Sequence, residues 1–275
     1  MLKNRLVLSK QIAILGCGWL GLPLATSLLE NGYQVRGSTT SEGKITNLEM
    51  LGVEVFIIDL KPNAIKGNIE GFLKNADTLI ISVPPKLRKN PEGDFVGKME
   101  CLINEIKNGC IAHVIFISST SVYGNLEGKI TENSNLHPIT ESGKQLVEAE
   151  NLLKQHRSFK TTIIRFAGLI GEDRHPANFL SGKKGIKHPN SYVNLIHQKD
   201  CIEIIKKIIA NTPENKTYHA AYPSHPIKRD YYTRQALKKG LAPPEFVPSD
   251  FKGKWIASDY LMKDLQYHFI KDINL

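Results

Sequence analysis

The sequence predicts an α/β fold, and three of its features carry that prediction. Six short apolar runs rich in β-branched residues follow one another through the first 170 residues, longer helical patterns separate most of them, and a glycine-rich segment directly follows the first run. Short, nearly continuous apolar runs are typical of strands that are covered on both faces. Strands that alternate with helices build a parallel sheet with right-handed crossovers. We therefore expect a Rossmann-type doubly wound parallel sheet with a smaller C-terminal substrate lobe.

The expected elements can be placed along the chain. The predicted strands are Ile12–Leu15, Gln34–Arg36, Val53–Ile58, Thr78–Val83, Val114–Ile117 and Thr162–Phe166. The helices predicted between them are Leu20–Glu30, Ile45–Leu51, Phe95–Ile106 and Ser142–His156, and three more are expected at Asp200–Ala210, Tyr231–Lys239 and Ser258–Leu265. The stretch GLIGEDRHPANFLSGKKGIKHPNS, which starts at Gly168, is expected to be loop with little regular structure.

This rhythm predicts two domains. Residues 1–170 form the dinucleotide-binding domain, to which 192–212 return, and residues 171–191 and 213–275 form the smaller substrate lobe.

Composition limits the class of protein. The chain has 275 residues and a formal net charge of +9, but residues 1–150 carry a net charge of −1 and the remainder carries +10. A uniformly basic coat for nucleic acid is therefore not expected, whereas an anion-binding second half is compatible with the count. The four cysteines are widely spaced, which argues against a metal site or disulfide framework. Without a signal-like or membrane-spanning apolar segment, we expect a cytoplasmic protein that does not associate with membranes.

The sharpest local motif is GCGWLG at residues 16–21, a G-x-G-x-x-G pattern between a predicted strand and a predicted helix. The first glycine permits a tight turn, the second lets the backbone approach a pyrophosphate, and the third lets helix and strand pack closely. Backbone N–H groups and the helix dipole then hold the phosphates. The motif predicts dinucleotide binding by Gly16, Cys17, Gly18, Trp19, Leu20 and Gly21.

The end of the second strand bears on the choice between NADP and NAD. An acid that grips the ribose 2′-hydroxyl is expected there, but the sequence reads RGSTTS from Arg36 to Ser41. Hydroxyl and N–H groups can bond a 2′-phosphate that a carboxylate would repel, so Ser38, Thr39 and Thr40 favour NADP, with NAD as the open alternative. Arg36 or Lys44 could add charge, and Ser41 could instead cap the next helix.

The segment FISSTSVYG at residues 116–124 resembles the S-S-x-x-V-Y-G segment of the extended short-chain dehydrogenase/reductases, a family of nucleotide-sugar epimerases, dehydratases and reductases. The segments RFAGLIG at 165–171 and NLIHQKD at 194–200 extend the resemblance over most of the chain. The resemblance implies an adenine contact at Asp59, beside Leu60, and a cofactor-lining segment at Ser82, Val83 and Pro84.

The same resemblance implies that Ser119 is the catalytic serine that hydrogen-bonds the reacting oxygen. The family's base is the Tyr of a Y-x-x-x-K pair, and here those two positions are Ser142 and Leu146. The chain is thus identified as an atypical, nucleoside-diphosphate-sugar epimerase-like member of the NAD-dependent epimerase/dehydratase type. The candidate substitutes for the missing pair are Tyr123 and Lys144 first, and also His137, Arg174, His175 and His197.

Three residues are candidates for the substrate. Arg174 and His175 stand where the family's substrate loop begins, and Arg174 could grip a diphosphate or simply lie at the surface. Asn194 could bond a sugar or phosphate, or satisfy the backbone.

Three hypotheses of function follow. The first is an NAD(P)-dependent epimerase, dehydratase or reductase that acts on a nucleotide-activated sugar or a similar small anion. The second is a catalytically silent NADP(H)-binding or redox-sensing protein with a protein partner. The third comes from GCGWLGLPLA, which is similar to the start of nucleotide-sugar dehydrogenases, but Cys101, Cys110 and Cys201 lack the Gly-rich setting of their nucleophile. A homodimer is left open.

Overall fold

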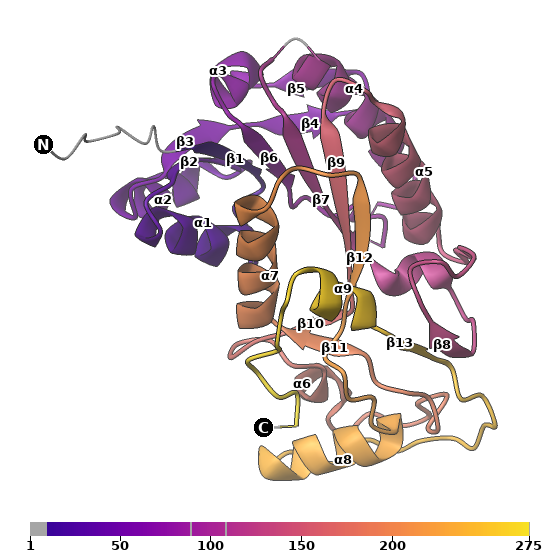
Figure 1. Ribbon diagram of the computed structural model, residues 1–275. Coiled ribbons are helices and arrows are strands. Elements are labelled where there is room, and N and C mark those ends of the chain that lie inside the picture. The colour runs from indigo at the N-terminus through magenta and orange to yellow at the C-terminus, as the bar shows by residue number, and fades with distance from the viewer. Residues whose placement is uncertain (1–9, 89, 108, 275) are drawn as a thin grey trace, which may run out of the picture. The chain divides into compact units, whose positions relative to one another are not determined.

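The computed structural model describes residues 10–88, 90–107 and 109–274, and a seven-stranded sheet is its central feature (Figure 1). The strand order is β12-β9-β7-β6-β1-β2-β3, and the pairs β3–β2, β2–β1, β1–β6 and β6–β7 are parallel. The strands are β1 (Gln11–Leu15), β2 (Gln34–Thr39), β3 (Glu54–Ile57), β6 (Thr78–Ile81), β7 (His113–Ser119), β9 (Lys160–Phe166) and β12 (Lys216–Ala220). The predicted Rossmann-type α/β fold is confirmed.

The chain divides into two compact units. The first comprises the chain up to Ile117, Glu148–Thr162 and Thr212–Asn215, and the second comprises Ser118–Val147, Ile163–Asn211 and the chain from Lys216 onward. The boundaries fall inside β7 and β9 and differ from the predicted division at residue 170. That domain division stays a prediction.

In the first unit, the order of the strands creates a switch point between β1 and β6. Helices α1 (Gly21–Glu30) and α2 (Ile45–Met50) lie on one side of these strands, and α3 (Ile69–Leu73) and α4 (Phe95–Lys107) lie on the other (Figure 1). Because β1 is covered on both faces, Ile12, Ala13 and Ile14 are fully buried. Ligands of open α/β sheets bind beyond the carboxyl ends of the strands at such a switch point. A short antiparallel pair, β4 (Asp59–Lys61) and β5 (Ala64–Lys66), and the turn η1 (Glu42–Lys44) complete this unit.

The second unit joins short strands and helices, and an apolar cluster that includes Ile170, Leu195 and Tyr231 lies among them. Its elements are η2 (Thr120–Tyr123), β8 (Gly128–Ile130), β10 (Gly168–Ile170), α6 (Pro176–Leu180), β11 (Leu195–His197), α7 (Gln198–Ala210), α8 (Lys228–Lys238), β13 (Lys254–Ile256) and α9 (Asp259–Asp264). Strands β10 and β11 pair in parallel, as do β13 and β8. Helix α5 (Glu141–Gln155) begins in this unit and ends in the first.

The prediction of a loop with little regular structure from Gly168 onward was wrong in part, because this stretch contains both β10 and α6. Helix α6 begins with Pro176 at its first position, and the His175 side chain accepts a hydrogen bond from the N–H of Ala177. Proline suits the first turn of a helix because its missing N–H would have no partner there. The local signal was therefore present in the sequence, in a helix only five residues long.

Buried polar groups fix the ends of several segments. The Asp200 carboxylate, fully buried, accepts hydrogen bonds from the Tyr267 hydroxyl at 2.7 Å and from the backbone N–H groups of Ile270 and Lys271 at 2.7 and 3.2 Å. It thereby ties the C-terminal tail to the first turn of α7. Such a carboxylate is costly to bury unless its oxygens are all bonded, and here they are.

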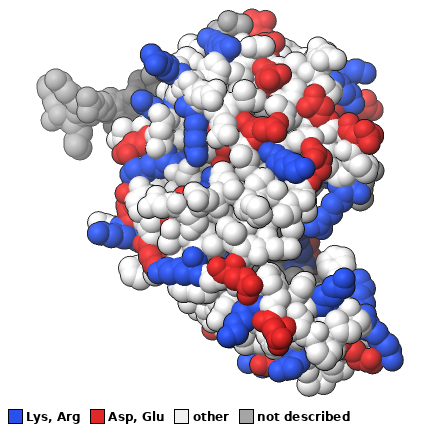
Figure 2. All heavy atoms as spheres, turned by 90° about the vertical axis from the view of Figure 1, so that its right-hand side faces the viewer, with Lys and Arg blue, Asp and Glu red and all other residues white. Residues whose placement is uncertain are grey.

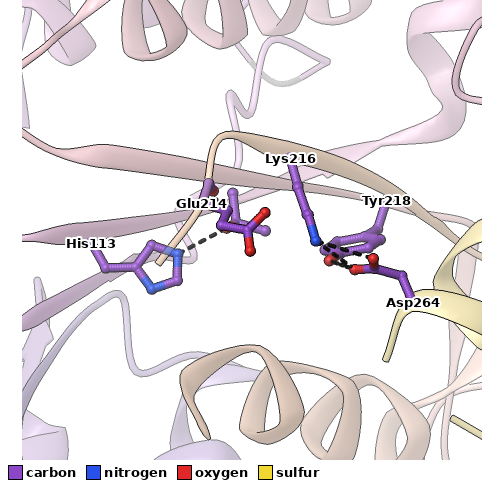
Figure 3. Close-up of polar contacts among 6 residues, drawn as sticks. His113, Glu214, Lys216, Tyr218 and Asp264 are labelled. Atoms are coloured by element: carbon purple, nitrogen blue, oxygen red, sulfur yellow. Dashed lines mark hydrogen bonds and ion pairs between the residues drawn. The ribbon is translucent and has the colours of Figure 1, made fainter. Parts of the chain in front are cut away.

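Two further clusters are drawn in Figure 3. Lys216 and Tyr218 of β12 both donate to the Asp264 carboxylate of α9, with Lys216 Nζ at 2.9 and 3.0 Å from the two oxygens. Burial raises the pKa of Asp264, but these bonds outweigh it and lower that pKa overall.

In the first unit, His113 Nε2 lies 2.8 Å from the Thr162 hydroxyl, which donates to the Glu214 carbonyl, and burial lowers the pKa of His113 to about 4.

The surface shows no continuous band of one charge on the face drawn in Figure 2, where Lys and Arg side chains are interspersed with Asp and Glu. Within the described part of the chain, no helix has the length and apolar character that a membrane span needs. The expectations of a cytoplasmic location and of no nucleic-acid partner stay predictions.

Candidate functional site

The glycine loop lies between the ends of three strands of the first unit. Gly16 follows β1 with a φ of +102°, and its N–H donates to the Ser38 hydroxyl at the end of β2 at 2.9 Å. The N–H of Cys17 donates to the Ser38 carbonyl at 2.7 Å. A Cβ added to Gly16 would come within 2.8 Å of Val83 Cγ1 and 3.3 Å of the Ser82 carbonyl oxygen, just past β6. The structure therefore brings Gly16, Ser38, Ser82 and Val83 together.

The other two glycines differ in what surrounds them. A Cβ on Gly21 would lie 2.2 Å from the Gly16 carbonyl oxygen, so only glycine lets α1 start this close to β1. A Cβ on Gly18 would meet no protein atom within 4 Å, and Gly18 is exposed. Helix α1 starts without a side-chain cap and without an acid in its first turn. Its N-terminal N–H groups and positive dipole end thus suit the phosphates of a dinucleotide.

The remaining residues predicted in the loop pack against the protein. Cys17 and Leu20 are buried, and Trp19 is half-buried. Burial raises the pKa of the Cys17 thiol to about 12, although a backbone hydrogen bond with Ser38 and the positive charge of Lys44 act to lower it. Cys17 is therefore a neutral packing group at neutral pH.

The hydroxyl groups at the end of β2 and just after it differ in their hydrogen bonds and exposure. The Ser38 hydroxyl accepts from Gly16, the Thr39 hydroxyl accepts from the N–H of Ser41 at 3.1 Å, and both residues are buried, whereas Thr40 is exposed. The Arg36 guanidinium is held by Glu54 at 2.8 Å. Lys44 is exposed and ends η1, the short helical turn that follows β2.

The other predicted cofactor residues lie in β4, which follows β3, and in the segment just after β6. Asp59 pairs with Lys61 at 2.8 Å and is partly exposed, while Leu60 is buried. Ser82 and Val83 are half-buried, and Pro84 is exposed.

Ser119 ends β7 and starts a tight turn in the second unit. Its hydroxyl oxygen accepts a hydrogen bond from the N–H of Ser121 at 3.1 Å and so caps η2. The residue is partly exposed, and its own O–H hydrogen remains to be donated. The first turn of α5 lies against this turn, because a Cβ on Gly143 would come within 3.2 Å of the Ser121 carbonyl oxygen.

The positions that match the family's Tyr and Lys are on that same helix. Ser142 is half-buried and Leu146 is buried at 5% exposure. The Lys144 side chain is 56% exposed, and its ammonium lies 3.9 Å from the Glu141 carboxylate. It therefore points to solvent at the helix surface. Its catalytic role stays a prediction.

Tyr123 belongs to a buried polar cluster. Its hydroxyl accepts from Arg165 Nη1 at 2.5 Å and lies 2.7 Å from His219 Nε2, and neither Tyr123 nor His219 has exposed surface. The Arg165 guanidinium also faces the Tyr123 ring, at 5.3 Å from its centre. Burial and the Arg165 charge lower the pKa of His219 to about 4. The cluster holds the turn that Ser119 begins, so Tyr123 acts here as a structural group, and a catalytic role for it stays a prediction.

The predicted substrate residues have different partners. Arg174 is exposed at a tight turn that Gly171 closes. His175 is buried, its Nδ1 accepting from Ala177 and its Nε2 lying 3.0 Å from the Tyr231 hydroxyl, and burial lowers its pKa to about 4. The Asn194 amide accepts from the N–H of Ile256 at 2.8 Å and donates to the Lys254 carbonyl at 2.9 Å. Two of the three thus bond main chain of their own unit.

Sequence reasoning did not find Arg165, His219 or Lys254. Arg165 and His219 reach Tyr123 across 42 and 96 residues of chain, so no local spacing marks them. Lys254, half-buried, donates to the carbonyl of Gly124 at the end of the Ser119 turn. It stands in a tail whose pattern indicated only short helices.

A doubly wound parallel sheet with a glycine loop between its first strand and helix defines a dinucleotide-binding Rossmann protein. The family model described as "NADP oxidoreductase coenzyme F420-dependent" matches residues 11–90. Protein YeeZ of Escherichia coli K12 is 33% identical over 267 residues, which cover 94% of this chain and 96% of that protein.

Solved structures are similar to this chain over nearly its whole length. A protein of Methylobacillus flagellatus, provisionally described as an NAD-dependent epimerase/dehydratase, is 26% identical with a TM-score of 0.76 and covers 96% of this chain and 93% of its own. UDP-glucuronic acid 4-epimerase of Bacillus cereus, in complex with NAD, is 18% identical with a TM-score of 0.78 and the same coverage. The chain belongs to the family of Protein YeeZ, within the extended short-chain dehydrogenase/reductases of the NAD-dependent epimerase/dehydratase type.

Gly18 and Gly21 predict opposite outcomes for the same substitution. Gly18→Ala places its methyl group in open space, so we expect an unchanged melting temperature and at least about 10-fold weaker dinucleotide binding, because the methyl group holds phosphate away from the backbone. Gly21→Ala forces α1 away from the Gly16 carbonyl, so we expect a loss of stability of about 2 kcal/mol or more. Thermal unfolding and cofactor titration of both variants check this. Tight binding by a folded Gly18→Ala protein would contradict the phosphate assignment.

The buried His219 predicts a dependence of stability on pH. Its pKa is lowered from 6.5 to about 4. Below about pH 6.5 the side chain is therefore protonated in the unfolded chain, whereas in the folded protein it stays neutral down to about pH 4. The free energy of unfolding therefore falls as the pH drops through this window, by about 1–2 kcal/mol for this group between about pH 7 and pH 5. His219→Gln should reduce that fall in urea titrations, and Tyr123→Phe, which leaves the imidazole buried, should keep most of it. Equal pH dependence in His219→Gln and the parent would disprove the assignment.

Proposed function

We propose that the protein binds NADP and a nucleotide-activated sugar and acts as an epimerase-, dehydratase- or reductase-like protein. The observation that carries this proposal is the glycine loop, where Gly21 can only be glycine and Gly18 faces open space. Those are the two requirements for a backbone cradle of a pyrophosphate. The similar Bacillus cereus epimerase, whose complex contains NAD, supports the same use of the loop.

The preference for NADP over NAD rests on the end of β2. The segment from Arg36 to Ser41 contains no carboxylate, so it lacks the acid that would hold a 2′-hydroxyl and repel a 2′-phosphate. Ser38 and Thr39 are buried and bonded, which leaves the exposed Thr40 and Lys44 as the groups able to meet it. The Arg36 guanidinium is paired with the Glu54 carboxylate, so we do not assign it to the 2′-phosphate.

Ser119 can act as a hydrogen-bond donor, but α5 offers no catalytic base at the position of the family's tyrosine. Its oxygen accepts from Ser121, so its proton can be donated to a carbonyl or hydroxyl oxygen of the substrate. A bound NADP supplies a hydride acceptor, and the hydroxyl proton of the substrate must leave to another acceptor, such as water. Because an unassisted serine hydroxyl titrates far above neutral pH, Ser119 orients and polarises the substrate oxygen but does not remove its proton.

A second candidate function follows from Leu146. A buried leucine at the position of the family's lysine removes both the cation that lowers the tyrosine pKa and a contact to the cofactor ribose. This favours a protein that binds NADP(H) without turnover and responds to it through a protein partner.

Lys44 gives a direct test of the cofactor preference. Removing its positive charge should weaken NADPH binding by about 5- to 10-fold and leave NADH binding within about 2-fold, because only NADPH carries the 2′-phosphate. Fluorescence titration of Lys44→Met with both cofactors measures this ratio. Lys66→Met, an equally exposed lysine in β5, is the matched control. Tighter binding of NADH than of NADPH by the parent protein would refute the preference.

The reaction itself is tested with nucleotide sugars. The protein is incubated with NADP and a panel of UDP- and other nucleotide-linked sugars, and both the 340 nm absorbance and the sugar products are followed. We expect conversion of at least one sugar and a loss of about 100-fold or more in Ser119→Ala, since a group that polarises the reacting oxygen is removed. Binding of NADPH with no turnover of any sugar would favour the second candidate instead.

A further inference from the structure

Lys254 is held rigidly at the start of β13. This strand pairs with β8, where Lys254 lies opposite Gly128. The Asn194 side chain bonds both the Lys254 carbonyl and the N–H of Ile256, at 2.9 and 2.8 Å. The backbone of Lys254 is therefore held by β8 on one side and by Asn194 on the other, so the position from which its side chain extends is defined.

The ammonium group of Lys254 differs from those of lysines that pair with a carboxylate. Lys129 and Lys216 each have a carboxylate within 2.9 Å, from Asp259 and Asp264. Lys254 is half-buried, its one bond goes to the Gly124 carbonyl, and over the described residues no carboxylate lies within ion-pair distance of it. Burial is the cause that lowers the pKa of Lys254. The protein thus keeps a partly desolvated cation without an acid.

Such a cation is unfavourable by itself, because burial penalises a charge that no opposite charge balances. One hydrogen bond to a carbonyl leaves two of its three N–H donors available. A cation in this state is suited to an anion that comes from outside the protein.

The position of Lys254 indicates which anion. Gly124 ends the turn that Ser119 begins, and a chain of this length in 3₁₀ geometry spans roughly 10 Å. In a nucleotide sugar, the charged diphosphate is separated from the reacting ring carbon by the rest of the ring. A substrate whose reacting oxygen meets Ser119 can therefore extend its diphosphate towards the Gly124 end.

We propose that Lys254 is a substrate-binding residue that recognises the diphosphate of a nucleotide-linked sugar. This rests on the proposed function and deepens it, because it assigns the charge recognition to the tail and not to the exposed Arg174. Lys254 makes this contact through its charge, while its bond to Gly124 keeps the ammonium group at the end of the turn.

Three variants separate charge recognition from a purely structural bond. Lys254→Gln keeps an N–H donor for the Gly124 carbonyl but has no charge, and Lys254→Arg keeps the charge. Lys252→Gln removes an equal charge from an exposed residue of the same segment. Thermal unfolding first confirms that each variant folds like the parent protein.

Binding of UDP-glucose and of inorganic diphosphate is then measured calorimetrically on the NADPH-saturated proteins at low and high salt. We expect Lys254→Gln to weaken both ligands about 10-fold or more, since a charge-assisted bond is lost, and to weaken the salt dependence. Lys252→Gln should stay within about 2-fold, Lys254→Arg should retain most of the affinity, and NADPH binding should not change.

The outcomes distinguish this inference from the proposed function. If UDP-glucose binds Lys254→Gln as tightly as it binds the parent, the inference is overturned and the proposed function stands. If neither anion binds the parent protein, the inference is also overturned. Diphosphate binding that depends on the charge of residue 254 supports the inference even where no sugar is turned over, so a failed reaction test does not decide it.

Discussion

The approach of α1 to β1 at Gly21 is the contact on which the dinucleotide site depends. No Cβ fits between this helix and the Gly16 carbonyl, and Gly16 itself turns with a positive φ against Val83. These two constraints set where α1 starts, and hence where its N–H groups and dipole end point. The Ser38 hydroxyl then fixes the loop from the side of β2. Phosphate binding by backbone groups needs this rigidity, because N–H donors that move lose the benefit of being preorganised.

Polar side chains in the second unit mainly hold main chain. His175 and His197 cap α6 and α7, and Asn194 links two segments by bonding β13. The first N–H groups of a helix have no partner within the helix and need such caps, so polar residues at helix starts are used for folding first. This explains why conspicuous polar residues of the sequence are occupied, while Lys254, which has no carboxylate partner in the described chain, is the residue that we propose for ligand binding.

Sequence patterns predicted the parts of the fold that burial on both faces dictates. Each of the six apolar runs contains a strand. The continuous burial that such runs predict is found in β1 and β6, whereas the edge strand β3 is only partly buried. Strand β12 was missed because it reads KTYHA, where Lys216 and Tyr218 are polar groups satisfied by Asp264. The glycine loop could be predicted because its requirements are local. The Tyr123 cluster and Lys254 could not, since their partners lie 42 to 130 residues away in the chain.

The buried Leu146 also limits how any catalysis by this chain can work. Because the side chain is 5% exposed, a lysine there would place an ammonium group in a buried position, with a cost that leucine avoids. The first turn of α5 nonetheless lies against the Ser119 turn, so the helix keeps its supporting role without its acid–base groups. Under the function that we propose, proton transfer is then left to water or to the substrate, whereas the protein orients the substrate and recognises its charge. Chemistry of that kind depends on binding energy, and a desolvated cation such as Lys254 is one way to supply it.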